Sequence, residues 1–120
     1  MPKKILYVED DTINALIVKK ILQKDYHIDI ANDSNTALNF LKDQDYEIIL
    51  LDVNLGEEKI DGIGFMQLIR QSSKNRNTKI LAITAFALPD DRDRFLSMGF
   101  DEYISKPIDK FNLLETIQKF

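Results

Sequence analysis

The stretch Ile48-Ile49-Leu50-Leu51 is apolar at every position and is followed by Asp52. A strand with one solvated face alternates apolar and polar residues, so a run without alternation predicts a strand that is covered on both faces. Strands of this kind are typical of parallel sheets that carry helices on either side. The sequence therefore predicts an α/β fold built around residues 48–51.

Four similar short runs occur along the chain, and longer segments with apolar residues three and four positions apart separate them. The five expected strands cover residues 5–8, 28–31, 48–51, 80–83 and 103–104. Five expected helices alternate with them. With right-handed crossovers, this order predicts a doubly wound, flavodoxin-like parallel sheet in which the strands are arranged 2-1-3-4-5.

Residues suited to helix ends mark several of the expected helices. Asp11 is expected to cap the first helix, Asp33 or Ser34 the second, and Gly99 to close the fourth in the left-handed conformation. The last helix is expected to start at Asp109. The apolar positions that define the helical patterns are Ile13, Leu16, Ile17 and Ile21; Ala37, Phe40 and Leu41; Phe65, Met66, Leu68 and Ile69; Phe95, Leu96 and Met98; and Phe111, Leu114 and Ile117.

Length and composition narrow the class of protein. A chain of 120 residues has the size of one domain, so we expect a single domain over residues 1–120. The absence of cysteine excludes disulfides, thiolate metal sites and a cysteine nucleophile. The net charge is −4 and the basic residues do not cluster, so direct binding to nucleic acid is not expected. Since no apolar run is long enough to span a bilayer and no signal peptide is evident, we expect a cytoplasmic location without membrane association.

Chemically useful side chains follow four of the five strand runs. They are Glu9 and Asp10, then Asp52, then Thr84 and Ala85, and finally Lys106 and Pro107. In a sheet of order 2-1-3-4-5 these positions converge on one edge, near the switch point where ligands bind. Crowded carboxylates repel one another unless a cation lies between them, and Mg²⁺ prefers such oxygen ligands. An aspartate beside a metal, a hydroxyl and a lysine is suited to accept a phosphoryl group, and Asp52 has this position.

This ordered set of residues resembles the receiver domain of two-component response regulators, of the stand-alone type or the type found in hybrid histidine kinases. The resemblance extends over essentially the whole chain. It implies that Asp52 is the phosphoacceptor and that Glu9 and Asp10 hold Mg²⁺. It also implies that the backbone carbonyl of Asn54 completes the metal shell and that Lys106 contacts the phosphoryl group.

The same resemblance implies how the domain signals. Thr84 matches the switch hydroxyl, Ala85 the small residue beside it, and Tyr103 the aromatic residue whose rotamer changes on phosphorylation. The bond before Pro107 is expected to be cis. The phosphoryl donor would be a histidine kinase or a histidine phosphotransfer protein, and the surface of the fourth helix, fifth strand and fifth helix would act on a downstream protein. The domain would be a monomer or a phosphorylation-dependent dimer.

A domain of this kind is a signalling switch that catalyses only its own phosphorylation and dephosphorylation. Two features depart from the family pattern: the loop of residues 54–62 is longer and lacks proline, and Phe86 is bulky at a position that influences access to the site. Taken singly, the residues have plainer roles. Asp11 is assigned to capping rather than to the metal, Thr84 could simply end a strand, and Lys106 could be a surface lysine. Their joint placement at one edge favours the functional interpretation.

Two other functions use similar features. A Mg²⁺-dependent phosphohydrolase that forms an aspartyl-phosphate typically has a second aspartate two residues after the nucleophile, where this chain has Asn54. A flavodoxin-like nucleotide or flavin module would need a Gly-, Ser- or Thr-rich loop after the first strand, where this chain has three consecutive acids, residues 9–11. A degenerate receiver that never accepts phosphate is the third alternative.

Overall fold

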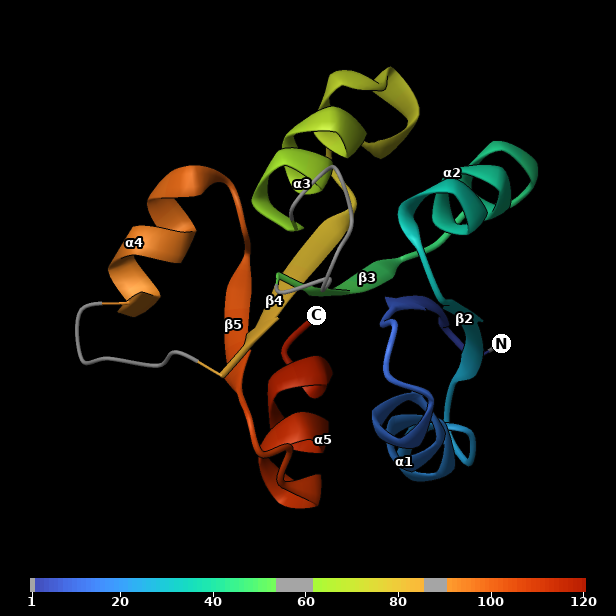
Figure 1. Ribbon diagram of the computed structural model, residues 1–120, viewed down its shortest axis with the longest axis vertical. Helices are drawn as coiled ribbons and strands as arrows, with labels where there is room; N and C mark the ends of the chain where they lie inside the picture. Colours follow the sequence, from blue (N-terminus) through green and yellow to red (C-terminus); the bar gives the residue numbers. More distant parts are fainter. Residues whose placement is uncertain (1, 54–61, 86–90) are drawn as a thin grey trace.

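The computed structural model describes residues 2–53, 62–85 and 91–120, and its centre is a five-stranded parallel sheet (Figure 1). The strands run in the order β2-β1-β3-β4-β5, and every neighbouring pair is parallel. The predicted fold class and strand order are therefore confirmed. The strands are β1 (Lys4–Val8), β2 (His27–Ala31), β3 (Ile48–Asp52), β4 (Lys79–Thr84) and β5 (Glu102–Ser105).

Helices cover both faces of the sheet, with α2, α3 and α4 on one side and α1 and α5 on the other (Figure 1). The helices are α1 (Thr12–Leu22), α2 (Ser34–Asp43), α3 (Gly62–Gln71), α4 (Asp91–Met98) and α5 (Lys110–Gln118), and a short 3-10 helix η1 (Ser73–Asn75) follows α3. None of the helices in the described part of the chain is both long and apolar enough to cross a membrane.

The central strand explains why the sheet needs two helical layers. All five residues of β3 are buried, as the unbroken apolar run predicts. Neighbouring β1 divides its side chains between the two layers by strand alternation: Leu6 and Val8 join the cluster under α2, α3 and α4, whereas Ile5 and Tyr7 join the cluster under α1 and α5. The sheet thus lies between two separate hydrophobic cores.

The capping predictions are confirmed where the structure describes them. The Asp11 carboxylate accepts from the backbone N–H groups of Ile13 and Asn14 at 2.8 and 3.0 Å. Asp33 caps α2 and Asp109 caps α5 in the same way. Gly99 closes α4 with a φ of 121°, in the region that favours glycine.

The inward faces of α1 and α5 differ from the sequence prediction. Ile13, Leu16 and Ile17 are 69, 53 and 47% exposed, and the buried residues of α1 are Ala15, Val18 and Leu22. Both sets fit helical spacing, and the set that joins the core contains the smaller Ala15. In α5, Phe111 is 77% exposed and its neighbour Leu113 is buried instead. In these two helices the prediction is therefore wrong for Ile13, Leu16, Ile17 and Phe111, whereas Ile117 is buried and Ile21 and Leu114 pack against the core.

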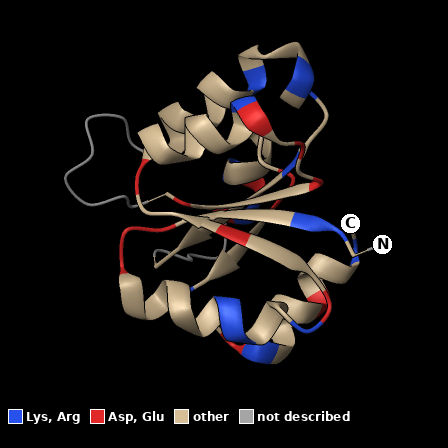
Figure 2. Cartoon of the chain, turned by 90° about the vertical axis from the view of Figure 1, so that its right-hand side faces the viewer, with Lys and Arg blue, Asp and Glu red and all other residues tan. Residues whose placement is uncertain are grey.

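Charged residues lie mostly outside these cores. Seen from the side in Figure 2, segments with Lys and Arg and segments with Asp and Glu are interspersed on both helical layers. The exceptions are a few buried carboxylates, and two of them, Glu9 and Asp52, lie at the carboxyl edge of the sheet. That edge is where the sequence predicts the site.

Candidate functional site

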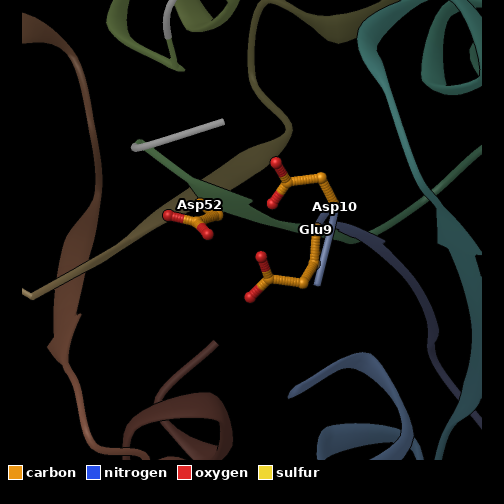
Figure 3. Close-up of side chains that lie close together, drawn as sticks. All are labelled: Glu9, Asp10 and Asp52. Atoms are coloured by element: carbon orange, nitrogen blue, oxygen red, sulfur yellow. The ribbon is translucent and has the colours of Figure 1, made fainter. Parts of the chain in front are cut away.

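Three carboxylates meet where β1 and β3 end. Glu9 and Asp10 extend from the end of β1 beside Asp52 at the end of β3 (Figure 3). Oxygen atoms of the three side chains all lie within 4.8 Å of one another. Glu9 and Asp52 are buried, at 0 and 1% exposure, whereas Asp10 is exposed. The cluster therefore has two buried carboxylates and one carboxylate that faces solvent.

Among the described residues, one lysine, Lys106, reaches this cluster from the segment that follows β5. The Lys106 ammonium lies 2.8 Å from Asp52 Oδ2 and 3.7 Å from Glu9 Oε1. Its backbone N–H donates to the Thr84 carbonyl at 2.8 Å, which fixes the chain as it leaves β5, and the bond from Lys106 to Pro107 is cis. Burial lowers the pKa of Lys106, but the hydrogen bond and the charge of Asp52 outweigh this effect and raise it overall. Lys106 is thus held as a cation.

The pKa of Glu9 is shifted well away from its ordinary value. Burial, and then the hydrogen bond and negative charge of Asp52, raise the pKa of Glu9 from 4.5 to about 8. Two contacts act in the opposite direction: the Tyr7 hydroxyl donates to Glu9 Oε1 at 2.8 Å, and Lys106 attracts the carboxylate. Without a metal, the site therefore holds more negative charge than one lysine can balance.

Thr84 and Ala85 lie next to this edge. Thr84 ends β4, is buried, and follows Ile83, which pairs with Asp52 across the sheet. Ala85 is exposed and, with Lys106, lines a hollow of about 420 Å³ between α1 and the segment after β5. Asn54, the predicted backbone ligand, lies outside the described residues, as do residues 55–61 and Phe86.

Tyr103 lies on β5 and packs against α4 rather than within the carboxylate cluster. Its ring is partly exposed, and its centroid is 5.9 Å from that of Phe95. Beside it, Arg92 of α4 donates to both carboxylate oxygens of Glu102, at 3.1 and 3.2 Å. Neither this ion pair nor the Tyr7–Glu9 hydrogen bond is predicted from the sequence. Strand alternation could have found the second, because Tyr7 and Glu9 are two residues apart.

The donor set fits a hard divalent cation. In the described part of the chain the candidate ligand atoms are carboxylate oxygens, and Mg²⁺ binds through one or two carboxylates, water and phosphate oxygens. Three ionised carboxylates and one ammonium leave two negative charges, which one divalent cation would balance. The structure thus brings together Glu9, Asp10, Asp52 and Lys106, with Thr84 and Ala85 at the end of the adjacent strand.

Comparison with known proteins identifies the family to which this arrangement belongs. The profile of the response regulator receiver domain matches residues 5–118. The chain belongs to the response regulator receiver domain family. It is a phosphoacceptor in two-component signalling, and domains of this family are signalling switches rather than classical enzymes.

Relatives of the receiver occur in two settings. The chain is 34% identical over 125 residues to hybrid signal transduction histidine kinase I of Dictyostelium discoideum, a match that covers 98% of this chain and 7% of the kinase. It is 28% identical over 121 residues to the polar-differentiation response regulator DivK of Brucella anthropi, with 100 and 97% covered. The receiver thus spans a small part of the first relative and nearly all of the second.

A solved receiver also shows the metal. The receiver domain of sensor histidine kinase PA1611 from Pseudomonas aeruginosa, with a magnesium ion coordinated in its active site cleft, is 30% identical to this chain. The TM-score is 0.86, and 99% of this chain and 97% of that chain are covered. These matches do not favour the phosphohydrolase or the nucleotide-binding alternative.

Proposed function

We propose that this receiver accepts a phosphoryl group on Asp52 from the phosphohistidine of a histidine kinase or a histidine phosphotransfer protein. The observation that carries this assignment is the buried Asp52 carboxylate, 2.8 Å from the Lys106 ammonium and inside the cluster of carboxylate oxygens. An attacking carboxylate needs a fixed cation beside it, because negative charge accumulates on the transferring oxygens.

The chemistry requires one bond to form and one to break. An oxygen of Asp52 attacks the phosphorus in line, the phosphorus–nitrogen bond to the donor imidazole breaks, and the imidazole leaves with the electron pair and takes up a proton. The product is an aspartyl-phosphate, which water later hydrolyses to restore the carboxylate. Lys106 stays beside the transferring oxygens and offsets their charge. Mg²⁺, when held by Glu9, Asp10, Asp52 and the backbone carbonyl of Asn54, would offset the rest.

The output is proposed to pass through the surface of α4, β5 and α5. Phosphorylation would draw the Thr84 hydroxyl, with Ala85 giving it room, toward the phosphoryl group and bias Tyr103 inward. The part of the surface that would respond is a polar hollow of about 310 Å³, which Tyr103, Arg92 and Glu102 line together with residues of α5. Such a change is a population shift between two states, which a downstream protein would read. We propose that residues 1–120 perform this role as a single domain in the cytoplasm.

Intact mass spectrometry after incubation with a small-molecule phosphodonor and Mg²⁺ tests the acceptor. The wild type should gain one phosphoryl group, and hydroxylamine should remove it, because acyl phosphates react with this nucleophile. Asp52→Ala should gain none, while the control Asp45→Ala, which removes an acid of 90% side-chain exposure, should label like the wild type. Labelling of Asp52→Ala at the wild-type level would refute the assignment.

A further inference from the structure

Tyr7 lies directly beneath the carboxylate cluster. It occupies β1 two residues before Glu9, so the two side chains project from the same face of the sheet. The ring is completely buried in the core under α1 and α5, and the hydroxyl donates to Glu9 Oε1 at 2.8 Å. A tyrosine from the core thus reaches a candidate metal ligand from the side opposite to solvent.

The contact determines how the Glu9 carboxylate can turn. Its Oε1 atom faces the Tyr7 hydroxyl and, at 3.7 Å, the Lys106 ammonium, while its Oε2 atom faces the backbone N–H of Asp11 at 3.4 Å. A carboxylate has two oxygens that can each accept more than one hydrogen bond, so these donors leave lone pairs for a cation or its water. Without the hydroxyl, the Lys106 ammonium would be the strongest donor near Oε1, and Glu9 would compete with Asp52 for it.

We propose that the Tyr7 hydroxyl is a positioning group for the Mg²⁺ site, holding the Glu9 carboxylate toward the cation and leaving Lys106 to Asp52. The inference rests on the proposed function, since it concerns the metal site of that function. Tyr7 does not touch the phosphoryl group or the metal, and it acts through Glu9. Residues that hydrogen-bond to metal ligands commonly change metal affinity by about 10- to 100-fold when they are replaced.

The chain offers a matched control in Tyr46. Its ring is 5% exposed, and its hydroxyl donates to Asp29 Oδ2 at 2.6 Å, so it makes the same kind of bond. Asp29 lies in β2 and does not belong to the carboxylate cluster. Tyr7→Phe and Tyr46→Phe each keep the buried ring and remove one hydroxyl, but only the first removes a contact to a candidate ligand.

Isothermal titration with Mg²⁺ measures the effect directly. Tyr7→Phe should raise the dissociation constant for Mg²⁺ about tenfold, and Tyr46→Phe less than about twofold. The rate of labelling by a small-molecule phosphodonor should distinguish Tyr7→Phe from Tyr46→Phe in the same way. The Mg²⁺ concentration that gives half the maximal rate should rise in Tyr7→Phe, and the rate at saturating Mg²⁺ should stay within about twofold of the wild type. A variant that was merely damaged would lose rate at every Mg²⁺ concentration.

Combining the change with Glu9→Gln shows whether Tyr7 acts through Glu9. In a Glu9→Gln background, Tyr7→Phe should cost less than about a further twofold in Mg²⁺ affinity, because interacting sites are not additive. A full tenfold loss in that background, or an unchanged affinity in Tyr7→Phe alone, would overturn the inference.

Tyrosine labelled with ¹³C at the ζ carbon gives an NMR readout in the wild type. Mg²⁺ should shift the Tyr7 signal and not that of Tyr46, and an unshifted Tyr7 signal also overturns the inference. Failure of the proposed function is separate, since it would appear as labelling of Asp52→Ala.

Discussion

The two ends of the sheet hold buried or partly buried charges in different proportions. At the amino end of β4, the Arg70 guanidinium donates to the Asp101 carboxylate at 2.8 Å and to several backbone carbonyls, including that of Gly99 at 3.1 Å and that of Thr78. Asp101 Oδ2 also accepts from the Ile80 backbone N–H at 2.8 Å. At the opposite end, Lys106 pairs with Glu9 and Asp52, and Asp10 adds a third carboxylate to the cluster.

The difference distinguishes a structural cluster from the candidate functional site. At the amino end, one cation meets one anion and the remaining donors meet carbonyl oxygens, so the charges are balanced and the contacts join α3, β4 and the turn after α4. At the carboxyl end, the excess of negative charge opposes folding in the absence of a cation and attracts one. We therefore infer that the two polar clusters have different roles because their ratios of positive to negative charge differ.

Removing Arg70 should have the largest effect on stability. Arg70→Ala leaves Asp101 and several carbonyls without their donor, and we expect a loss of about 3 kcal/mol in the free energy of unfolding, measured by urea denaturation. The affinity for Mg²⁺ should stay within about twofold of the wild type, because the cluster lies at the far end of the sheet. The exposed Arg76, replaced by alanine, serves as the control. A loss below about 1 kcal/mol, or a large change in Mg²⁺ affinity, would remove the contrast between the two ends.

The pH dependence of stability should come from the carboxyl end. In the metal-free protein the folded state keeps the Glu9 proton up to a pKa of about 8, whereas the unfolded chain releases it near the ordinary value of 4.5. The folded state therefore binds more protons between these values, so this contribution to stability is fully present below the lower pKa and is lost as pH rises through the upper one.

Urea denaturation in the presence of a chelator measures this loss. We expect a loss of about 2 kcal/mol between pH 6 and pH 8 for the wild type and a flatter profile for Glu9→Gln. Both proteins are best compared in a His27→Gln background, which removes the one histidine of the chain. Equal slopes for the two proteins would show that Glu9 is not the source.

Mg²⁺ should stabilise the fold through the same carboxylates. At ten times its dissociation constant, a ligand that binds only the folded state adds about 1.4 kcal/mol. Asp10→Ala should lose most of this gain, since Asp10 is the exposed carboxylate of the proposed metal site. Asp101→Ala should lower stability at every Mg²⁺ concentration and keep the gain. Thermal midpoints with and without Mg²⁺ give the comparison, and an equal Mg²⁺ response in Asp10→Ala and the wild type would contradict the proposed metal site.

Strands and strand ends could be predicted from the sequence because period and position alone define them. The run from Ile48 to Leu51 required two covered faces, and the sheet order then brought Asp52 to the same edge as Glu9 and Lys106. The capping role of Asp11 followed from its place before a helix.

The faces of α1 could not be predicted in this way. Helical spacing allows both the set with Leu16 and Ile17 and the set with Ala15 and Val18, and only packing against the sheet selects between them. The partners of the long polar side chains were missed for a related reason. Arg70 contacts Gly99 and Asp101, which lie 29 and 31 positions further along the chain, and no local sequence pattern encodes such a contact.

The smallest expected effect distinguishes capping from metal binding among the three consecutive acids. Asp11 Oδ1 accepts from the backbone N–H groups of Ile13 and Asn14, and serine caps helices about as well as aspartate. Asp11→Ser should therefore change the free energy of unfolding by less than about 0.5 kcal/mol and the dissociation constant for Mg²⁺ by less than about twofold. Asp10→Ser, one residue earlier, should instead weaken Mg²⁺ binding strongly while having no cap to lose. If Asp11→Ser weakened Mg²⁺ binding as much as Asp10→Ser, the Asp11 carboxylate would belong to the metal site, and the excess of negative charge at the carboxyl end would be larger by one.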